Sequence, residues 1–161
     1  MRTEGNAEAS MRRMADVVAI STLLNRYAQA LDGTDSETWL ACFEVDATFV
    51  AAQSDAPDVL GMNLAGIDDL RAWIIGYHDV HNAPFRSKHF LSHPVVDFVD
   101  DDEATSVTYF VTQGPAPDGG IRMMTNGRYL DRLRRGPSGT WRFRARLALR
   151  DLAATDIPAW R

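Results

Sequence analysis

The stretch that decides the fold is residues 104–149, ATSVTYFVTQGPAPDGGIRMMTNGRYLDRLRRGPSGTWRFRARLAL. Apolar and polar residues alternate within three segments of it, as expected of strands that bury one face. The segments are 104–113, 121–135 and 140–149, and turns rich in glycine and proline separate them at 114–120 and 137–139. We therefore expect three long strands joined one after another as antiparallel hairpins.

Helical periodicity governs the chain before these strands. Apolar residues recur every three or four positions from Asp16 to Leu31, with Asp16 as the expected N-cap and Gly33 as the expected end of the helix. Asp32 then lies in the last turn, where the helix dipole disfavours a carboxylate by roughly 0.3–1 kcal/mol. We expect either a partner that compensates for this position or a use for the carboxylate.

Shorter elements fill the middle of the chain. The pattern Thr34–Glu37 is that of a capping box and predicts a short second helix with Trp39, Leu40 and Phe43 directed inward. The remaining expected elements are a strand at 47–53, a loop at 54–66, a helix at 67–78 and a strand at 88–99.

Helices followed by consecutive antiparallel strands indicate the α+β class. We expect a cone-shaped single domain whose strongly curved, mainly antiparallel sheet wraps around the N-terminal helices and encloses a pocket. The expected organisation is a flexible leader at 1–12, the α+β domain at 13–153 and a C-terminal tail at 154–161.

Composition narrows the classes of function. The chain has 161 residues, 45% of them apolar, and a net charge of −5, which argues against nucleic acid as a partner. Its one cysteine, Cys42, excludes an internal disulfide and a cysteine-based zinc site. No apolar run reaches the roughly 18 residues of a membrane helix, and the first ten residues lack the apolar core of a signal peptide. We expect a cytoplasmic protein with no membrane partner.

Several short motifs together resemble the SnoaL-like family of the nuclear-transport-factor-like superfamily. They occur in the family's order and spacing over roughly residues 14–151, and they are Leu24–Asp32, Trp39–Phe49, Ser87–Leu91, Gly127–Leu133 and Trp141–Phe143 with Arg146. The superfamily includes a dehydratase, a dehydrochlorinase, polyketide cyclases, isomerases and β subunits of ring-hydroxylating dioxygenases. The resemblance is more specific for the fold than for the reaction, because this fold hosts many chemistries.

The resemblance implies a catalytic pair of Asp32 and His89 and places Tyr27 in the pocket. We expect the Tyr27 hydroxyl to donate a proton to a substrate oxygen there. A histidine beside a carboxylate can act as a general base at neutral pH, because the carboxylate fixes its tautomer and stabilises the imidazolium. Two positions depart from relatives: Tyr129 stands where the dehydratase has an asparagine, and Tyr27 where the dehydrochlorinase has a lysine. The alternative interpretation is a capping aspartate, a hydrogen-bonded core histidine and a packed core tyrosine.

The expected substrate contacts are Tyr129, Asn126, His93, Trp39, Phe43 and Arg146. Alternation places Tyr129 and Asn126 on opposite faces of their strand, and the sequence leaves open which face is concave. Arg146 is equally well explained as the ion partner of Asp131 or Asp151. The four histidines, at 78, 81, 89 and 93, do not predict a metal site, because on a strand His89 and His93 lie about 13 Å apart.

The sequence thus favours a lyase or isomerase of the dehydratase or cyclase type, which needs no cofactor or metal. The expected substrate is a small, largely apolar cyclic compound such as a polyketide or steroid-like molecule. Two alternatives stay open: a non-catalytic protein that binds a small molecule, and an assembly subunit like the dioxygenase β chain. The resemblance also implies a homo-oligomer, either a dimer or a trimer.

Overall fold

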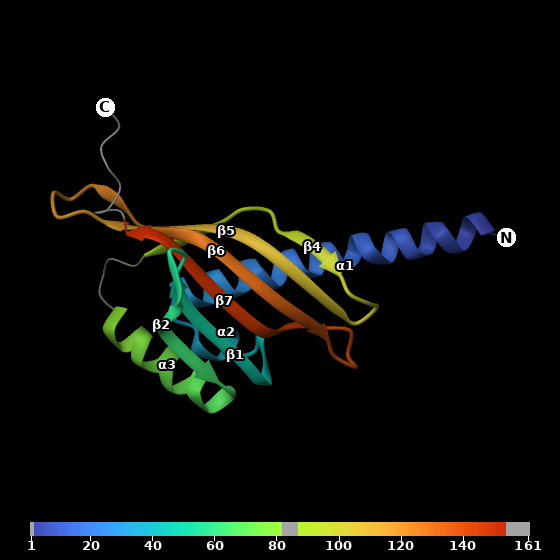
Figure 1. The fold of residues 1–161 in the computed structure, drawn as a ribbon, viewed down its shortest axis with the longest axis horizontal. Helices are drawn as coiled ribbons and strands as arrows, with labels where there is room; N and C mark the ends of the chain where they lie inside the picture. Colours follow the sequence, from blue (N-terminus) through green and yellow to red (C-terminus); the bar gives the residue numbers. More distant parts are fainter. Residues whose placement is uncertain (1, 82–86, 154–161) are drawn as a thin grey trace.

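The computed structural model of the chain describes residues 2–81 and 87–153, and its strands form one mixed sheet (Figure 1). The order across the sheet is β2-β1-β7-β6-β5-β3, and β4 pairs with the other half of the same edge of β5. Neighbouring strands are antiparallel except β1 and β7, which are parallel. The strands are β1 (Phe43–Gln53), β2 (Ala56–Ala65), β3 (Lys88–Leu91), β4 (Val95–Phe98), β5 (Glu103–Pro115), β6 (Ile121–Arg135) and β7 (Trp141–Ala153).

The three long strands β5, β6 and β7 confirm the alternation in the sequence. They form two consecutive antiparallel hairpins, and the tip of the β5–β6 hairpin projects at the end of the molecule opposite the N-terminus (Figure 1). Gly127 allows β6 and β7 to approach, because a Cβ at this position would overlap the carbonyl oxygen of Leu149. The α+β fold with a mainly antiparallel sheet is therefore as expected.

Three helices accompany the sheet: α1 (Arg2–Gly33), α2 (Ser36–Leu40) and α3 (Ile67–His81). The end of α1 at Gly33 confirms the prediction, but Asp16 as its N-cap is wrong. Residues 2–15 already belong to the helix, because they contain strong helix formers and no proline. Asp16 lies in the middle of the helix, and its side chain is buried. The Asp16 carboxylate accepts hydrogen bonds from the Trp141 indole (3.0 Å) and from Arg135 (3.2 Å).

The N-cap of α2 is one residue later than the capping-box pattern predicts. Asp35 accepts the Thr38 backbone N–H at 3.0 Å, whereas Thr34 adopts a left-handed backbone conformation with φ 59°. Phe43 is buried as expected, but it begins β1 and is not part of the helix. The predicted C-terminal tail at 154–161 lies outside the described residues.

Two predictions about strands are corrected. The expected loop at 54–66 is largely β2, an edge strand on which Pro57 is tolerated and from which Met62 and Leu64 pack against the core. The expected strand at 88–99 is interrupted at 92–94, where Pro94 lacks a backbone donor, so that β3 and β4 are separate.

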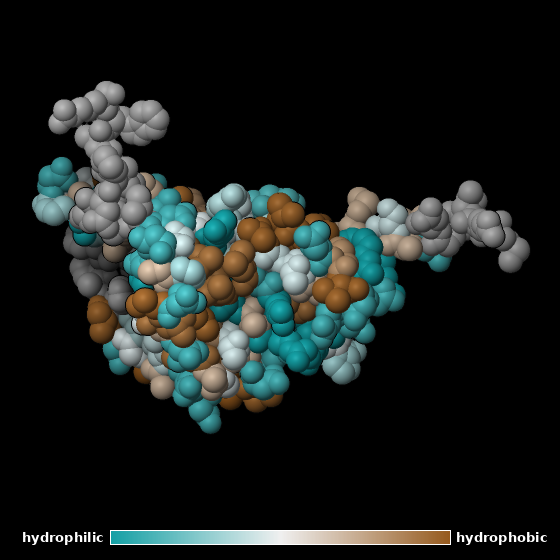
Figure 2. Space-filling view, in the orientation of Figure 1, coloured by the Kyte–Doolittle hydropathy of each residue, from teal (hydrophilic) through white to brown (hydrophobic). Residues whose placement is uncertain are grey.

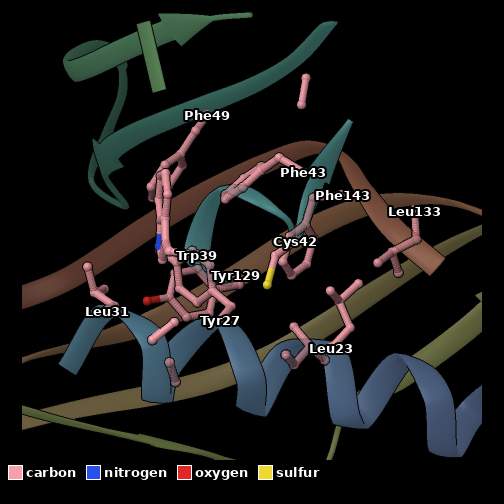
Figure 3. Close-up of a cluster of buried hydrophobic side chains, with 14 of the residues drawn as sticks. Leu23, Tyr27, Leu31, Trp39, Cys42, Phe43, Phe49, Tyr129, Leu133 and Phe143 are labelled. Atoms are coloured by element: carbon pink, nitrogen blue, oxygen red, sulfur yellow. The ribbon is translucent and has the colours of Figure 1, made fainter. Parts of the chain in front are cut away.

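The core lies between α1 and the inner face of the sheet. Figure 3 shows aromatic side chains from α1, α2, β1, β6 and β7 meeting there. Tyr27 is at the centre, with ring centroids 5.6–6.3 Å from those of its aromatic neighbours Trp39, Phe43, Phe49, Tyr129 and Phe143. The face in view in Figure 2 is mixed instead, with hydrophobic and hydrophilic side chains side by side. The buried groups that could perform chemistry therefore lie on the inner face.

Candidate active site

Asp32, from the last turn of α1, contacts His89, from β3. Its Oδ1 lies 2.6 Å from His89 Nδ1, and its Oδ2 accepts the His89 backbone N–H at 2.8 Å. Both side chains are 9% exposed. Because a carboxylate only accepts hydrogen bonds, this contact assigns the imidazole hydrogen to Nδ1. Nε2, the second ring nitrogen, makes no hydrogen bond to the part of the chain that the structure describes. The two hydrogen bonds also offset the unfavourable position of Asp32 at the negative end of the helix dipole.

Backbone contacts fix the helix end that carries Asp32. The Asp35 N–H donates to the Ala30 carbonyl at 2.9 Å, which closes a Schellman motif with Thr34 in the left-handed position. His78 of α3 reaches the same place: its Nε2 lies 3.1 Å from the Leu31 carbonyl oxygen and its Nδ1 lies 2.8 Å from Ser36 Oγ. His78 thus links the carbonyl of Leu31, the residue before Asp32, to α3 and, through Ser36, to α2. These contacts fix the end of α1 and hold the Asp32 carboxylate toward His89.

A cavity of about 370 Å³ opens on the inner face of the sheet beside His89. Strand register explains its position, because His89 pairs with Thr112 of β5, and Thr112 pairs with Thr125 of β6. Its lining residues are Gln53, Tyr77, Ser87, His89, Thr112, Met124, Thr125 and Arg150. The volume falls at the small end of the roughly 300–1,000 Å³ typical of ligand pockets.

The cavity combines hydrogen-bonding groups with one formal positive charge. Arg150 brings the guanidinium group, and no carboxylate belongs to the lining. Burial raises the pKa of Tyr77; a hydrogen bond with Ser87 opposes this shift, and the charge of Asp32 adds to it. The Tyr77 hydroxyl therefore stays protonated at neutral pH.

Five of the residues predicted for the site form part of the core instead of the cavity lining. They are Tyr27, Trp39, Phe43, Tyr129 and Arg146. The guanidinium of Arg146 is fully buried, makes a bidentate pair with Asp131 at 2.8 and 2.9 Å, and lies about 4 Å from three aromatic ring centres. Of the two ion partners considered for Arg146, the structure selects Asp131.

This core cluster shifts its own ionisable groups. Burial raises the pKa of Tyr27 to about 12, although Arg146 and Trp39 oppose the shift. Burial also raises the pKa of Tyr129, with a further contribution from Tyr27. Burial disfavours the charged form of Arg146, but Asp131 outweighs it and keeps the pKa of the guanidinium above its ordinary value. The cluster at neutral pH is therefore an ion pair surrounded by neutral phenols.

Asn126 and His93 lie away from the cavity. Asn126 lies between Thr125 and Gly127, where the pairing of β6 with β7 shifts in register. Its side chain is not part of the cavity lining. His93 is exposed and borders a separate hollow of about 410 Å³ over α1. Predicted residues that the structure brings together at the cavity are thus His89 and, behind it, Asp32.

The sequence reading missed most of the cavity lining, namely Gln53, Tyr77, Ser87, Thr112, Met124, Thr125 and Arg150. Thr112 and Thr125 could have been found from the pairing partners of His89, had the register been known. Arg150 resembled the other arginines of its strand, and nothing in the sequence separates it from them.

Other features of the described residues do not form a second chemical site. No three of their histidine, cysteine, aspartate and glutamate side chains are grouped as metal ligands, and the side chain of His81 lies outside the description. A larger hollow of about 1050 Å³ lies between the β5–β6 hairpin loop and Lys88 with Phe90, which alternate on β3 with His89 and so face away from it. None of the described helices is long and apolar enough to cross a membrane.

The chain belongs to the SnoaL-like domain family, because residues 12–147 match the family model. No curated protein sequence matches the chain significantly.

Solved structures share the fold. The β subunit of a putative aromatic-ring-hydroxylating dioxygenase from Novosphingobium aromaticivorans aligns with a TM-score of 0.77 at 21% identity, over 87% of this chain and 92% of that one. A variant of Rv3472, a protein of unknown function from Mycobacterium tuberculosis, aligns with a TM-score of 0.72 at 25% identity, over 91% and 79%. ActVI-ORFA from Streptomyces coelicolor aligns with a TM-score of 0.69 at 20% identity, over 83% and 96%. The first and the third likeness concern the fold alone.

Proposed function

We propose that this SnoaL-like protein is an acid–base lyase or isomerase that acts on a small cyclic compound in the cavity beside His89. The observation that carries the proposal is the contact of 2.6 Å between His89 Nδ1 and Asp32 Oδ1. It orients the imidazole so that Nε2, which makes no hydrogen bond to any residue that the structure describes, is the nitrogen available to a ligand.

In this proposal His89 acts as the general base. Nε2 takes a proton from a substrate carbon next to an electron-withdrawing group, and the developing imidazolium is stabilised by Asp32. In a dehydration, the electron pair of the broken C–H bond forms the new double bond, and the hydroxyl on the neighbouring carbon leaves as water with the proton from His89. In an isomerisation, His89 returns the proton to another carbon of the substrate.

Tyr77 is the candidate donor to the substrate oxygen. It lines the cavity, and its raised pKa keeps the hydroxyl protonated while charge develops on that oxygen. Tyr27, for which the sequence predicted this role, is 1% exposed within the aromatic core and does not line the cavity. We therefore assign the donor role to Tyr77 in this proposal.

The base can be tested with 5-nitrobenzisoxazole, a small ring compound whose opening needs only a base. Removal of its ring proton breaks the nitrogen–oxygen bond and gives a coloured nitrile-bearing phenolate, so the rate is read directly. We expect His89→Ala to lower this rate by about 10²–10⁴-fold, the usual contribution of general acid–base catalysis. The matched control is His93→Ala, an exposed histidine outside the cavity, which should leave the rate unchanged. Equal rates for wild type and His89→Ala would overturn the proposal.

The orienting role of Asp32 has a separate readout in the ¹⁵N NMR shifts of the His89 ring. The wild type should show the Nδ1–H tautomer, and Asp32→Ala should release it toward the Nε2–H form, which is protonated at the wrong nitrogen for catalysis. Asp35→Ala, which removes only the cap of α2, serves as the control. An unchanged tautomer in Asp32→Ala would show that the carboxylate does not orient the ring.

A second candidate is an assembly subunit, favoured by the fold likeness to a dioxygenase β subunit over 92% of that chain. A subunit of this kind would copurify with a partner chain, and His89→Ala would leave the complex intact. Base catalysis by the isolated chain that depends on His89 would argue for the enzyme instead.

A further inference from the structure

Arg150 has no ion partner among the residues that the structure describes. Its Nε is buried and makes no hydrogen bond, and Arg150 forms no salt bridge with any residue that the structure describes. The other inward-facing arginines of the sheet are paired: Arg146 with Asp131, and Arg135 with Asp16 and Asp102. A buried guanidinium N–H without an acceptor costs free energy, so the position of the Arg150 Nε calls for an acceptor such as an anion.

The surrounding backbone leaves room for this side chain. A Cβ at Gly61 of β2 would lie 2.9 Å from Arg150 Nη2, and a Cβ at Gly127 of β6 would lie 3.0 Å from the Arg150 Cα. Gly61 stands at a register shift between β1 and β2, where the edge of the sheet departs from regular pairing. Arg150 is thus accommodated by glycines on both sides, and the guanidinium extends toward β2.

The cavity favours a negatively charged ligand at the Arg150 end. Among the described residues, its lining holds the Arg150 cation and no carboxylate, in a chain whose net charge is −5. The hydroxyls of Thr112 and Thr125, which also line it, donate to backbone carbonyls of β6, so Arg150 is the charged donor that the lining offers. The guanidinium fork matches a carboxylate in bidentate geometry, and charge-assisted hydrogen bonds of this kind are roughly twice as strong as neutral ones.

Arg150 and His89 both line the cavity. Their strands are separated by β6 and β5, so three strand spacings of about 4.8 Å place the two backbones about 14 Å apart along the sheet. A ligand anchored at Arg150 therefore extends across the inner face before it reaches His89 Nε2. The Met124 side chain of β6 also lines the cavity and offers an apolar contact for a ring.

We infer that Arg150 binds the carboxylate of the substrate, so that the substrate is a small cyclic organic acid held with its reacting C–H toward His89. That this ligand is a substrate rests on the proposed function. It adds an anionic group to the small, largely apolar ring compound that the sequence suggests.

Benzoate and benzamide test the anion site, because they have nearly the same shape and differ in charge. Their binding to the wild-type protein is measured by titration calorimetry at low ionic strength. We expect benzoate to bind at least tenfold more tightly than benzamide, and Arg150→Met to reduce this preference to less than threefold. Arg150→Lys, which keeps the charge, should retain part of the preference. Arg128→Met, on an exposed arginine of β6, is the matched control and should leave it unchanged.

The outcomes separate this inference from the proposed function. Benzoate preference should survive in His89→Ala, since the anion site does not need the base. If His89→Ala loses benzisoxazole opening but the wild type does not prefer benzoate over benzamide, His89 is supported as the base and the anion site at Arg150 is overturned. A preference that depends on Arg150, together with unchanged benzisoxazole opening in His89→Ala, would support the anion site in a binding protein. A preference that persists in folded Arg150→Met, or no binding of either compound at millimolar concentration, would overturn the inference.

Discussion

At the scale of single residues, Arg146 and Asp131 form a fully buried ion pair in the core. Both side chains are 0% exposed, and Asp131 also accepts a hydrogen bond from Ser106. The Arg146 guanidinium lies 3.9–4.1 Å from the ring centres of Tyr27, Tyr129 and Phe143. Its Nη1 has no hydrogen-bond partner among the residues that the structure describes. Such a pair offers little net stability over an apolar core, but each member strongly depends on the other.

Replacing only Arg146 should therefore destabilise the fold severely. We expect Arg146→Met to lower the free energy of unfolding by about 3–5 kcal/mol, because it leaves the Asp131 carboxylate buried without its counter-charge. Urea unfolding followed by circular dichroism measures the change. Arg132→Met, exposed on the neighbouring strand, should change stability by less than about 0.5 kcal/mol. A loss below 1 kcal/mol for Arg146→Met would mean that Asp131 does not depend on this cation.

The contact between Asp32 and His89 differs from this core ion pair in its exposure. Asp32 holds His89 through a side-chain and a backbone contact, yet both side chains keep 9% of their surface exposed. His89 can therefore contact a ligand in the cavity, whereas Arg146 is enclosed by protein on all sides. Burial thus distinguishes the residue that we propose as the base from the residue that supports the fold.

At the scale of elements, the end of α1 sets the site. The helix covers the inner face of the sheet only as far as Gly33, and the Schellman motif there turns the chain into α2. The left-handed position of that motif is taken by Thr34, where glycine is the usual residue and a β-branched side chain is strained. Backbone strain of this kind stands two residues from Asp32, at the point where the carboxylate must be held.

Relief of this strain should be measurable. We expect Thr34→Gly to raise the free energy of unfolding by about 0.5–1 kcal/mol, because glycine adopts a positive φ without the steric penalty, although it gains more entropy on unfolding. Thr34→Asn should give a smaller gain. Both are measured by urea unfolding, and a loss of stability in Thr34→Gly would show that the threonine side chain contributes more than the strain costs.

The elements that the sequence predicts well are those whose signal is local. Alternation in β5, β6 and β7 and the stop at Gly33 follow from neighbouring residues alone. The edge strand β2 escaped prediction because Pro57 and Gly61 signal a loop, and only pairing with β1 makes them part of a strand. The start of α1 was misplaced for a related reason: residues 2–15 have helix propensity, but they lack the apolar stripe by which the helix was located.

At the scale of the whole molecule, the site depends on contacts that no local pattern encodes. Asp32 and His89 stand 57 residues apart, and the resemblance to the SnoaL-like family predicted a pair that the structure places in contact. Arg150 and Thr112 reach the same cavity only through the register of β3, β5, β6 and β7. A shift of one residue in any of these pairings would turn a lining side chain to the outer face, so the lining could not be read from the sequence.

The same buried core gives the whole molecule a characteristic response to alkaline pH. Burial raises the pKa of Cys42 to about 11 and of Tyr27 to about 12, and it raises the pKa of Tyr129 as well. In the unfolded chain these groups titrate near their ordinary values of about 8.5 for cysteine and about 10 for tyrosine. Between the two sets of values the unfolded state has lost protons that the folded state retains, so stability falls as the pH rises.

We therefore expect the free energy of unfolding to be level up to about pH 8 and to decline as unfolded Cys42 ionises. It should decline more steeply above about pH 10, where Tyr27, Tyr129 and Tyr77, whose pKa is also raised, join. Each group contributes at most about 1.4 kcal/mol per pH unit, so urea unfolding at a series of pH values under reducing conditions gives the number of protons involved. Tyr27→Phe removes one of these groups and should make the decline above pH 10 shallower by up to one proton. Tyr109→Phe, at a tyrosine that is 63% exposed, should leave the slope unchanged. Identical slopes for wild type and Tyr27→Phe would mean that Tyr27 can ionise in the folded protein, which its enclosure between α1 and the sheet argues against.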